Sequence, residues 1–298
     1  MNIKMKKGIS IWCFDTSLSL EQCFKAAKKA GFDGIELALA EGNAKFEGMD
    51  LALVENGEIN LNSSKDDIEN VATLAKENGL ELYSFASGLS WQYSPTSNNP
   101  EIREKAQLIL HKQIEVASWL GCETILVIPG MVNADFVSNC EIVEYDVAYD
   151  RAFDYVKKAL TFAEEKKIEL GIENVWNKLL LSPLEMRDFI DKLDSPFVGA
   201  YFDVGNVLAN GYPEHWIKIL NKRIKKVHVK DYRRVAGGLH GFVDLLCGDV
   251  DFPAVIKAFK EINYDGWLTA EILPPYKYYS DQLLVNTSLS MDRIINLK

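Results

Sequence analysis

The sequence predicts an α/β fold, a (β/α)8 TIM barrel that forms a single domain over residues 1–298. Short apolar runs alternate with amphipathic stretches along the whole chain, which predicts parallel strands joined by helices. The chain has 298 residues, or about 37 for each of eight such units, and this length suits a barrel. A doubly wound open sheet is the competing architecture. It usually has a glycine-rich first turn, and the first turn here, WCFDTSLS, contains no glycine.

Eight strands and eight helices are expected in alternation. The expected strands cover residues 8–14, 34–40, 80–87, 124–129, 168–174, 198–203, 226–231 and 267–273. The expected helices cover residues 19–30, 64–78, 100–120, 146–166, 183–193, 214–222 and 253–262, and a last one begins near residue 281. Ser182 is an expected N-cap with Glu185 as its capping-box partner, and Gly31 and Gly79 are expected helix ends.

Composition narrows the class of protein. The formal net charge is −10 and the pI is about 5.1, so nucleic acid is a disfavoured partner. The five cysteines are scattered and form no C-x-x-C pair, which argues against a disulfide framework or a thiolate zinc site. No apolar run approaches the roughly 18 residues of a membrane span. We therefore expect a cytoplasmic protein with no membrane association.

Four consecutive expected strands each direct one polar group into the barrel. Alternation along the strands places Glu173, Asp203, His228 and Glu271 inward at the carboxyl ends, where barrel enzymes carry their catalytic groups. Any one of them alone would be read as a solvated strand end or a satisfied polar core residue. Three carboxylates gathered together would repel one another without a cation, so the set predicts one bound divalent metal ion. Mn²⁺ is the preferred candidate, and Co²⁺, Zn²⁺ and Mg²⁺ also suit these ligands.

Further polar and aromatic residues are candidates for substrate binding at the same mouth. Glu36 ends the second expected strand and could bind substrate, support a ligand or be a hydrated strand end. Trp12, Trp91 and Trp176 lie at or just beyond strand ends, where they could stack on sugar faces or pack in the core.

The segment after His228 is rich in cations. Lys230, Arg233 and Arg234 could hold a substrate phosphate or acid, or be surface charge. His240 is expected to be exposed. Residues 237–251 are too long for a minimal loop and are a candidate lid or rim.

Four segments resemble a known family. GIENVW, YFDVGN, HVKDYRR and GDVDFPAVIKAFKEINYDGWLTAE resemble the xylose-isomerase-like TIM-barrel superfamily of sugar phosphate isomerases and epimerases. The resemblance covers essentially the whole chain. It is greatest to the branch of hexulose-6-phosphate isomerases and L-xylulose- or L-ribulose-5-phosphate 3-epimerases.

The resemblance implies roles for particular residues. It implies that the four inward groups bind the metal, that Glu173 and Glu271 are the acid–base pair, and that Arg234 binds substrate. Two positions depart from the related ketose 3-epimerases. Asn206 stands where they have a histidine, and Leu179 stands where they have a second glutamate. Asn206 is therefore kept as a substrate-binding candidate, and the substrate's identity stays open.

The function expected from these residues is proton transfer next to a ketose carbonyl held by the metal. A carboxylate would remove the proton to give an enediolate, and the other would return it. Return to the opposite face would make the protein an epimerase, and return to the neighbouring carbon would make it an aldose–ketose isomerase. The expected partner is a sugar or sugar phosphate, and a homodimer or homotetramer is compatible with this reading.

Three alternatives remain at the level of sequence. The same scaffold serves metal-dependent dehydratases of a keto-cyclitol or polyol. A DNA repair endonuclease of this superfamily would need a trinuclear zinc cluster with several more histidines, whereas this chain has four histidines in all and a net charge of −10. A non-catalytic sugar-binding protein is the third.

Overall fold

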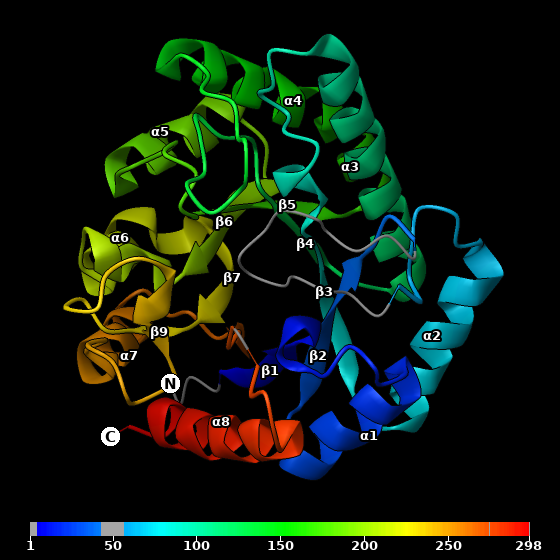
Figure 1. The fold of residues 1–298 in the computed structure, drawn as a ribbon, viewed down its shortest axis with the longest axis vertical. Helices are drawn as coiled ribbons and strands as arrows, with labels where there is room; N and C mark the ends of the chain where they lie inside the picture. The colour runs from blue at the N-terminus through cyan, green and yellow to red at the C-terminus, as the bar shows by residue number, and fades with distance from the viewer. Residues whose placement is uncertain (1–4, 43–56, 274, 298) are drawn as a thin grey trace.

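Eight parallel strands close into a barrel in the computed structural model, which describes residues 5–42, 57–273 and 275–297. Neighbouring strands pair in the order β1-β10-β7-β6-β5-β4-β3-β2, and β1 pairs with both β10 and β2. The helices lie around the strands as an outer ring (Figure 1). The predicted (β/α)8 barrel is confirmed, and the open doubly wound sheet is excluded by the closed strand order.

The elements alternate as the apolar periodicity predicts. The barrel strands are β1 (Lys6–Ser10), β2 (Gly34–Leu39), β3 (Glu81–Ser87), β4 (Thr124–Val127), β5 (Glu169–Glu173), β6 (Val198–Asp203), β7 (Ile224–Val229) and β10 (Trp267–Ala270). The helices are α1 (Leu20–Ala30), α2 (Lys65–Glu77), α3 (Pro100–Leu120), α4 (Tyr145–Lys166), α5 (Pro183–Leu193), α6 (Pro213–Leu220), α7 (Phe252–Glu261) and α8 (Ser280–Ile295). None of the described helices is long and apolar enough to cross a membrane.

Two local predictions need correction. The first strand ends at Ser10 instead of residue 14, because the chain turns into a short 3₁₀ helix, Ile11–Cys13, whose Trp12 N–H donates to Ser10 Oγ. The loop after β7 contains a small antiparallel pair, β8 (Asp231–Tyr232) with β9 (Phe242–Val243). Two-residue strands are too short to leave a periodic signal in the sequence.

Helix caps follow the sequence with one difference. Ser182 accepts a hydrogen bond from Glu185 N, as an N-cap should, but the Glu185 carboxylate accepts from Leu181 N and from the Tyr145 hydroxyl. The reciprocal half of the predicted capping box is therefore absent from α5. Helix α1 ends at Gly31, which has a φ of 93°, a conformation that favours glycine.

Side chains that alternate along a strand fill two different spaces. On β6, Phe202 faces outward and packs against Trp216 of α6 and Phe259 of α7. Its neighbours Tyr201 and Asp203 face the interior, where both are fully buried. This alternation carries polar groups into the barrel while keeping the surrounding layer apolar.

The interior is closed at the amino ends of the strands. Tyr83 of β3 stacks on Trp267 of β10 with ring centroids 3.7 Å apart, and its hydroxyl lies 2.8 Å from Thr269 Oγ1. A Cβ atom on Gly8 of β1 would lie 1.9 Å from the Tyr83 hydroxyl, so this position of β1 requires glycine. Side chains therefore fill the barrel interior at the amino ends of the strands, which leaves the carboxyl ends for a ligand.

Candidate metal centre

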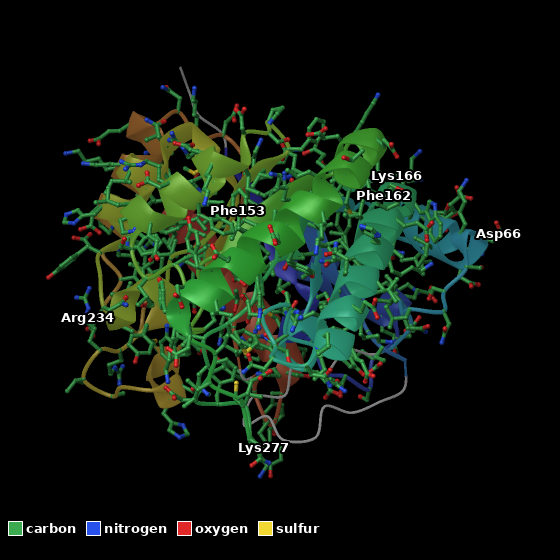
Figure 2. The ribbon with its side chains drawn as sticks, turned by 90° about the horizontal axis from the view of Figure 1, so that it is seen from above. Asp66, Phe153, Phe162, Lys166, Arg234 and Lys277 are labelled. Atoms are coloured by element: carbon green, nitrogen blue, oxygen red, sulfur yellow. The ribbon has the colours of Figure 1, made fainter. Side chains whose placement is uncertain are left out.

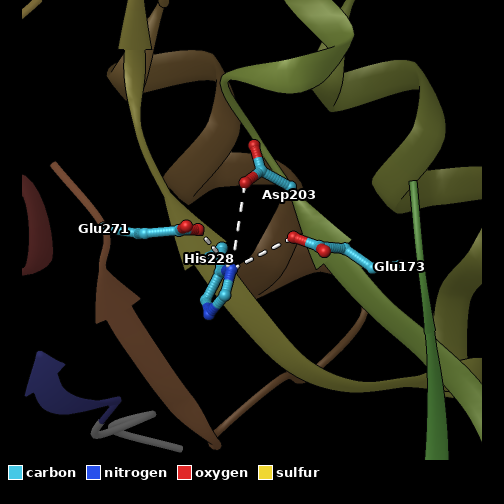
Figure 3. A group of neighbouring side chains, drawn as sticks. All are labelled: Glu173, Asp203, His228 and Glu271. Atoms are coloured by element: carbon cyan, nitrogen blue, oxygen red, sulfur yellow. Dashed lines mark hydrogen bonds and ion pairs between the residues drawn. The ribbon is translucent and has the colours of Figure 1, made fainter. Parts of the chain in front are cut away.

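Four buried side chains meet at the carboxyl ends of adjacent strands. Glu173 ends β5, Asp203 ends β6, His228 lies near the end of β7, and Glu271 directly follows β10. Each offers one ligand atom, and these atoms all lie within 4.8 Å of one another. Figure 3 shows the three carboxylates pointing at the same ring nitrogen of His228. The structure thus brings together the four residues that strand alternation selected.

His228 Nδ1 lies in the middle of the carboxylates. It is 2.7 Å from Glu271 Oε2, 3.1 Å from Glu173 Oε1 and 3.9 Å from Asp203 Oδ2. All four side chains are at most 6 % exposed, so solvent does little to screen their charges.

The opposite face of the imidazole is held by Glu36. His228 Nε2 lies 2.8 Å from Glu36 Oε1, and Glu36 Oε2 accepts hydrogen bonds from Ser84 Oγ and the Tyr201 hydroxyl. Glu36 is fully buried beneath the histidine and does not line the cavity described below. Glu36 thus lies where a carboxylate that supports a metal-ligating histidine would lie, and its role stays a prediction.

Lys230 is a fifth charged group in the cluster. Its Nζ lies 2.9 Å from Asp203 Oδ2 and 2.7 Å from Glu271 Oε2. Neither oxygen accepts a well-directed hydrogen bond from any described residue, despite this short contact. Asp203 and Glu271 both belong to the set of residues that could hold a metal ion.

Burial and mutual charge shift the protonation equilibria of the cluster. Burial raises the pKa of Glu173 and of Asp203, because a charge loses its hydration there. Burial acts in the same direction on Glu271, but the charges of Lys230 and His228 outweigh it and lower the pKa of that carboxyl. For His228 burial lowers the pKa, yet Glu36 and Glu271 raise it by more. Glu173 and Asp203 therefore resist ionisation, whereas Glu271 and His228 favour their charged forms.

A divalent ion fits this donor set. Three carboxylate oxygens and one imidazole nitrogen converge in a buried space, and two of those oxygens lack a directed hydrogen-bond donor among the described residues. Oxygen-rich sets with one imidazole suit Mn²⁺, Co²⁺, Zn²⁺ and Mg²⁺. The imidazole is also oriented from behind by a carboxylate, as metal-ligating histidines usually are.

Asparagine side chains fix the end of β6 beside the cluster. Asn174 makes two hydrogen bonds with the backbone of Asp203. Asn174 Nδ2 donates to Asp203 O at 2.8 Å, and Asp203 N donates to Asn174 Oδ1 at 2.8 Å. Asn206 N donates to Asp203 Oδ1 at 2.7 Å, and Asn206 Nδ2 donates to Asn174 O. Asp203 Oδ1 is thereby occupied, and Oδ2 is left facing Lys230 and the other carboxylates.

A cavity opens at the cluster. Glu173, Glu271 and Lys230 form part of its polar lining, together with Asn206. Its walls are otherwise apolar. They are formed by Trp12, Trp91, Ile128, Phe136, Val175, Trp176, Leu239, Phe242 and Leu273. An apolar cavity with a few convergent polar groups is the usual form of a small-molecule site.

The predicted substrate-binding residues divide into two groups. Trp12, Trp91, Trp176 and Asn206 line the cavity. Arg234 does not line it. Its Nε donates to Leu208 O and its guanidinium packs on the Tyr212 ring. Figure 2 shows Arg234 at the periphery of the molecule.

The other cations of this loop also lie away from the cluster. Arg233 donates to Cys247 O at 2.7 Å, and the exposed His240 is absent from the cavity lining although its neighbour Leu239 belongs to it. Residues 237–251 therefore contribute to the rim of the cavity through Leu239 and Phe242.

The sequence names Lys230 as a cation but does not place it beside the carboxylates, and it does not predict most of the apolar wall. Lys230 lies two residues after His228, so the alternation that selects the histidine also directs the lysine inward. This alternation is the signal that could have placed the lysine in the cluster. Phe136, Leu239 and Phe242 come from connecting loops, where no periodic pattern marks a residue as cavity-lining.

Comparisons with known proteins agree with this fold. A family model described as "Xylose isomerase-like TIM barrel" matches residues 24–286. An uncharacterised protein of Methanocaldococcus jannaschii is 28% identical over 189 residues, which is 60% of each chain, so the match spans less than two thirds of that relative. An L-ribulose-5-phosphate 3-epimerase of Salmonella paratyphi A is 22% identical over 275 residues, 88% of this chain and 86% of that protein. A solved structure of an L-ribulose 3-epimerase superposes with a TM-score of 0.76 at 17% identity, covering 98% of this chain and 94% of that one.

Proposed function

The chain belongs to the xylose isomerase-like TIM barrel family, and from this premise we propose that it is a divalent-metal-dependent isomerase or epimerase of sugars or sugar phosphates. One observation carries the proposal. A buried cluster of three carboxylates and one imidazole lies at the foot of a cavity whose walls are mainly aromatic and aliphatic. The relatives named above include epimerases, which are isomerases, and this agrees with the proposed reaction class.

Glu173, Asp203, His228 and Glu271 would hold the ion. A bound divalent ion supplies Lewis-acid polarisation of a substrate carbonyl and acidifies the adjacent C–H bond. Glu36 would keep the imidazole oriented, because it holds Nε2 while Nδ1 faces the carboxylates. Asn174 and Asn206 would hold Asp203 through its backbone and its Oδ1 atom.

Glu173 and Glu271 are the proposed acid–base pair. They come from β5 and β10, which are separated in the barrel by β6 and β7, so they reach the cavity from different sides. One carboxylate would remove the proton next to the carbonyl and the other would return it. Return to the opposite face of the same carbon inverts it. Return to the neighbouring carbon interconverts a ketose and an aldose.

The aromatic walls suit a sugar. Trp12, Trp91 and Trp176 present large apolar surfaces to the cavity, and such surfaces pack against the C–H-rich faces of sugar rings and chains. They also keep water away from the carboxylates during proton transfer. We propose a ketose, free or phosphorylated, as the substrate class.

The arrangement of the histidines supports a sugar enzyme over a DNA repair endonuclease. His228 is in the cluster, whereas His111 packs near Phe162, His215 near Tyr212, and His240 is exposed. A trinuclear zinc site would need several histidines together. The net charge of −10 also disfavours a polyanionic substrate.

Exchange of a substrate C–H with solvent tests the proposal. The protein is loaded with Mn²⁺ and incubated in D₂O with D-fructose, D-tagatose, L-ribulose and L-ribulose 5-phosphate. The metal is then removed and the sugars are read by NMR. We expect deuterium at one carbon next to the carbonyl of at least one sugar, and a new epimer or aldose. The Glu271→Gln variant should retain some metal binding and lose the exchange. Absence of exchange with every sugar in the panel would contradict the proposal.

A further inference from the structure

Lys230 is part of the lining of the cavity. It follows β7 and lies on the same side as His228, one step nearer the cavity, which it lines. The residue is 9% exposed, so its ammonium is held inside the protein. A Cβ atom on Gly205 would lie 2.4 Å from Lys230 Cβ, and the glycine therefore provides the space that the lysine stem occupies. Its Nζ also lies 5.8 Å from the centroid of the Phe242 ring in the cavity wall.

The charges around Lys230 distinguish it from an ordinary ion-paired lysine. Its ammonium lies 2.9 Å from Asp203 Oδ2 and 2.7 Å from Glu271 Oε2, and both carboxylates belong to the set that could hold a metal ion. A cation at those oxygens repels a second cation, so the lysine opposes the binding of a divalent ion. The positive charge of Lys230 therefore does not help the cluster to bind a divalent ion.

A positive charge beside the metal site has a use in proton transfer. When a C–H proton leaves a carbon next to a carbonyl, negative charge develops on the carbonyl oxygen. An ammonium fixed in a buried cavity stabilises that charge more than water does, because it needs no reorganisation. Lys230 is the lysine of the described cavity lining, and its ammonium has three N–H donors, one more than its two carboxylate contacts use.

We propose that Lys230 is a further catalytic residue. Its ammonium donates a hydrogen bond to the substrate oxygen that becomes negative during proton transfer, and it weakens divalent-ion binding at Asp203 and Glu271. This inference rests on the proposed isomerase function. In the proton transfer the substrate proton moves from carbon to a carboxylate, and the electron pair of the C–H bond shifts toward the carbonyl oxygen. Lys230 keeps its own proton.

Lys226 offers a matched control for a substitution at Lys230. It lies two positions earlier than His228 on β7, it is 5% exposed, and it is also ion-paired, with Glu123 at 3.2 Å. Lys226 does not line the cavity. Replacing either lysine by methionine removes one buried ammonium from the same strand, and only one of the two faces the cluster.

The test measures Mn²⁺ affinity without substrate and deuterium exchange with the sugar panel. We expect K230M to bind Mn²⁺ about 10-fold more tightly or better, because a repelling charge is gone. Exchange should slow about 100- to 1,000-fold, as when one donor to a developing oxyanion is removed. K226M should match the wild type in both measurements. Wild-type exchange rates in K230M would overturn the inference, and so would weaker Mn²⁺ binding, which would indicate a purely structural clamp on Asp203 and Glu271.

A second measurement uses the wild-type chain and does not depend on the folding of a variant. A crystal structure with Mn²⁺ and acetohydroxamate, a small two-oxygen mimic of a ketose carbonyl and hydroxyl, should show Lys230 Nζ about 3 Å from a ligand oxygen. A lysine that contacts only protein carboxylates there would overturn the inference. If the wild type exchanges no sugar in the panel, the proposed function fails. The Mn²⁺ affinities and this crystal structure still report on Lys230, so the two failures are distinguishable.

Discussion

The two ends of the barrel use charged and polar side chains in opposite ways. At the amino ends of the strands each cation has its own acidic partner. Lys7 Nζ lies 2.6 Å from Asp292 Oδ1, and Lys226 Nζ lies 3.2 Å from Glu123 Oε2. The side chains of Asp292 and Glu123 are at least half exposed, so water would still hydrate each carboxylate if its lysine were removed. At the carboxyl ends three buried carboxylates share one imidazole and one ammonium.

The two ends of the barrel differ in what their polar groups do: those at the amino ends stabilise the fold, and those at the carboxyl ends form the candidate binding site. At the amino ends the Tyr83–Trp267 stack fills the interior, and the ammonium groups of Lys7 and Lys226 each contact one carboxylate. The carboxyl end concentrates like charges where hydration is lost, which is unfavourable for the fold unless a cation binds. Substitutions at the amino ends should therefore affect unfolding, and substitutions at the carboxyl ends should affect ligand binding.

The largest effect on the free energy of unfolding is expected at the amino ends of the strands. Trp267→Ala should lower the free energy of unfolding by about 3–5 kcal/mol, because it leaves a cavity beneath Tyr83. Mn²⁺ binding by the folded fraction should stay at the wild-type affinity. Denaturant unfolding and a metal titration measure the two quantities. Trp176→Ala, at the half-buried opposite end, is the control and should cost less stability. Equal losses at the two ends would argue against the distinction.

The next effect concerns Glu36, which connects the interior to the mouth. Glu36→Gln should raise the dissociation constant for Mn²⁺ about 10- to 100-fold, as loss of a carboxylate behind a metal-ligating histidine usually does. Isothermal titration calorimetry measures it. The ¹⁵N shifts of His228 should also report a changed tautomer balance, which a purely structural role would not produce. Ser84→Ala removes one donor to Glu36 and is the milder control. An unchanged dissociation constant in Glu36→Gln would remove Glu36 from the site.

A gain in stability is expected when one charge of the cluster is removed. In the presence of a chelator, Glu173→Gln should raise the free energy of unfolding by about 0.5–2 kcal/mol, because a buried like charge is lost and the shape is kept. The same variant should bind Mn²⁺ more weakly. Thermal unfolding with and without Mn²⁺ separates the two effects. A loss of stability in chelator would mean that Glu173 belongs to the scaffold.

Sequence patterns predicted the part of the site that lies on regular strands. Period-two alternation places Glu173, Asp203, His228 and Glu271 on the inner side, and the closed barrel brings those four positions together. The turn after Ser10 and the β8–β9 pair depend on hydrogen bonds that only the folded chain provides.

Arg234 illustrates the limit of position along the chain. The family resemblance implies that Arg234 binds substrate, and this stays a prediction; in the structure its guanidinium donates to the carbonyls of Leu208 and Gly211, from another loop. Loop geometry of this kind depends on contacts between segments distant in sequence, and no local pattern encodes it.

The smallest effect on the free energy of unfolding is expected for the ion pair of Lys226 at the amino end of β7. Lys226→Met should change the free energy of unfolding by about 0–1 kcal/mol, because its partner Glu123 is 75% exposed and can be hydrated when unpaired. Denaturant titration measures it. A loss well above that range would show that the lower ion pairs contribute more to the fold than their exposure indicates.

The central claim is that Glu173, Asp203, His228 and Glu271 form one divalent-metal site. Its most direct test is a Mn²⁺ titration of chelator-treated protein, followed by electron paramagnetic resonance of the unbound ion. The account predicts one tightly bound ion per chain, and a rise of at least about 100-fold in the dissociation constant for Asp203→Asn, beyond the usual effect of a supporting residue. A stoichiometry near zero, or an Asp203→Asn variant that binds Mn²⁺ as the wild type does, would contradict it.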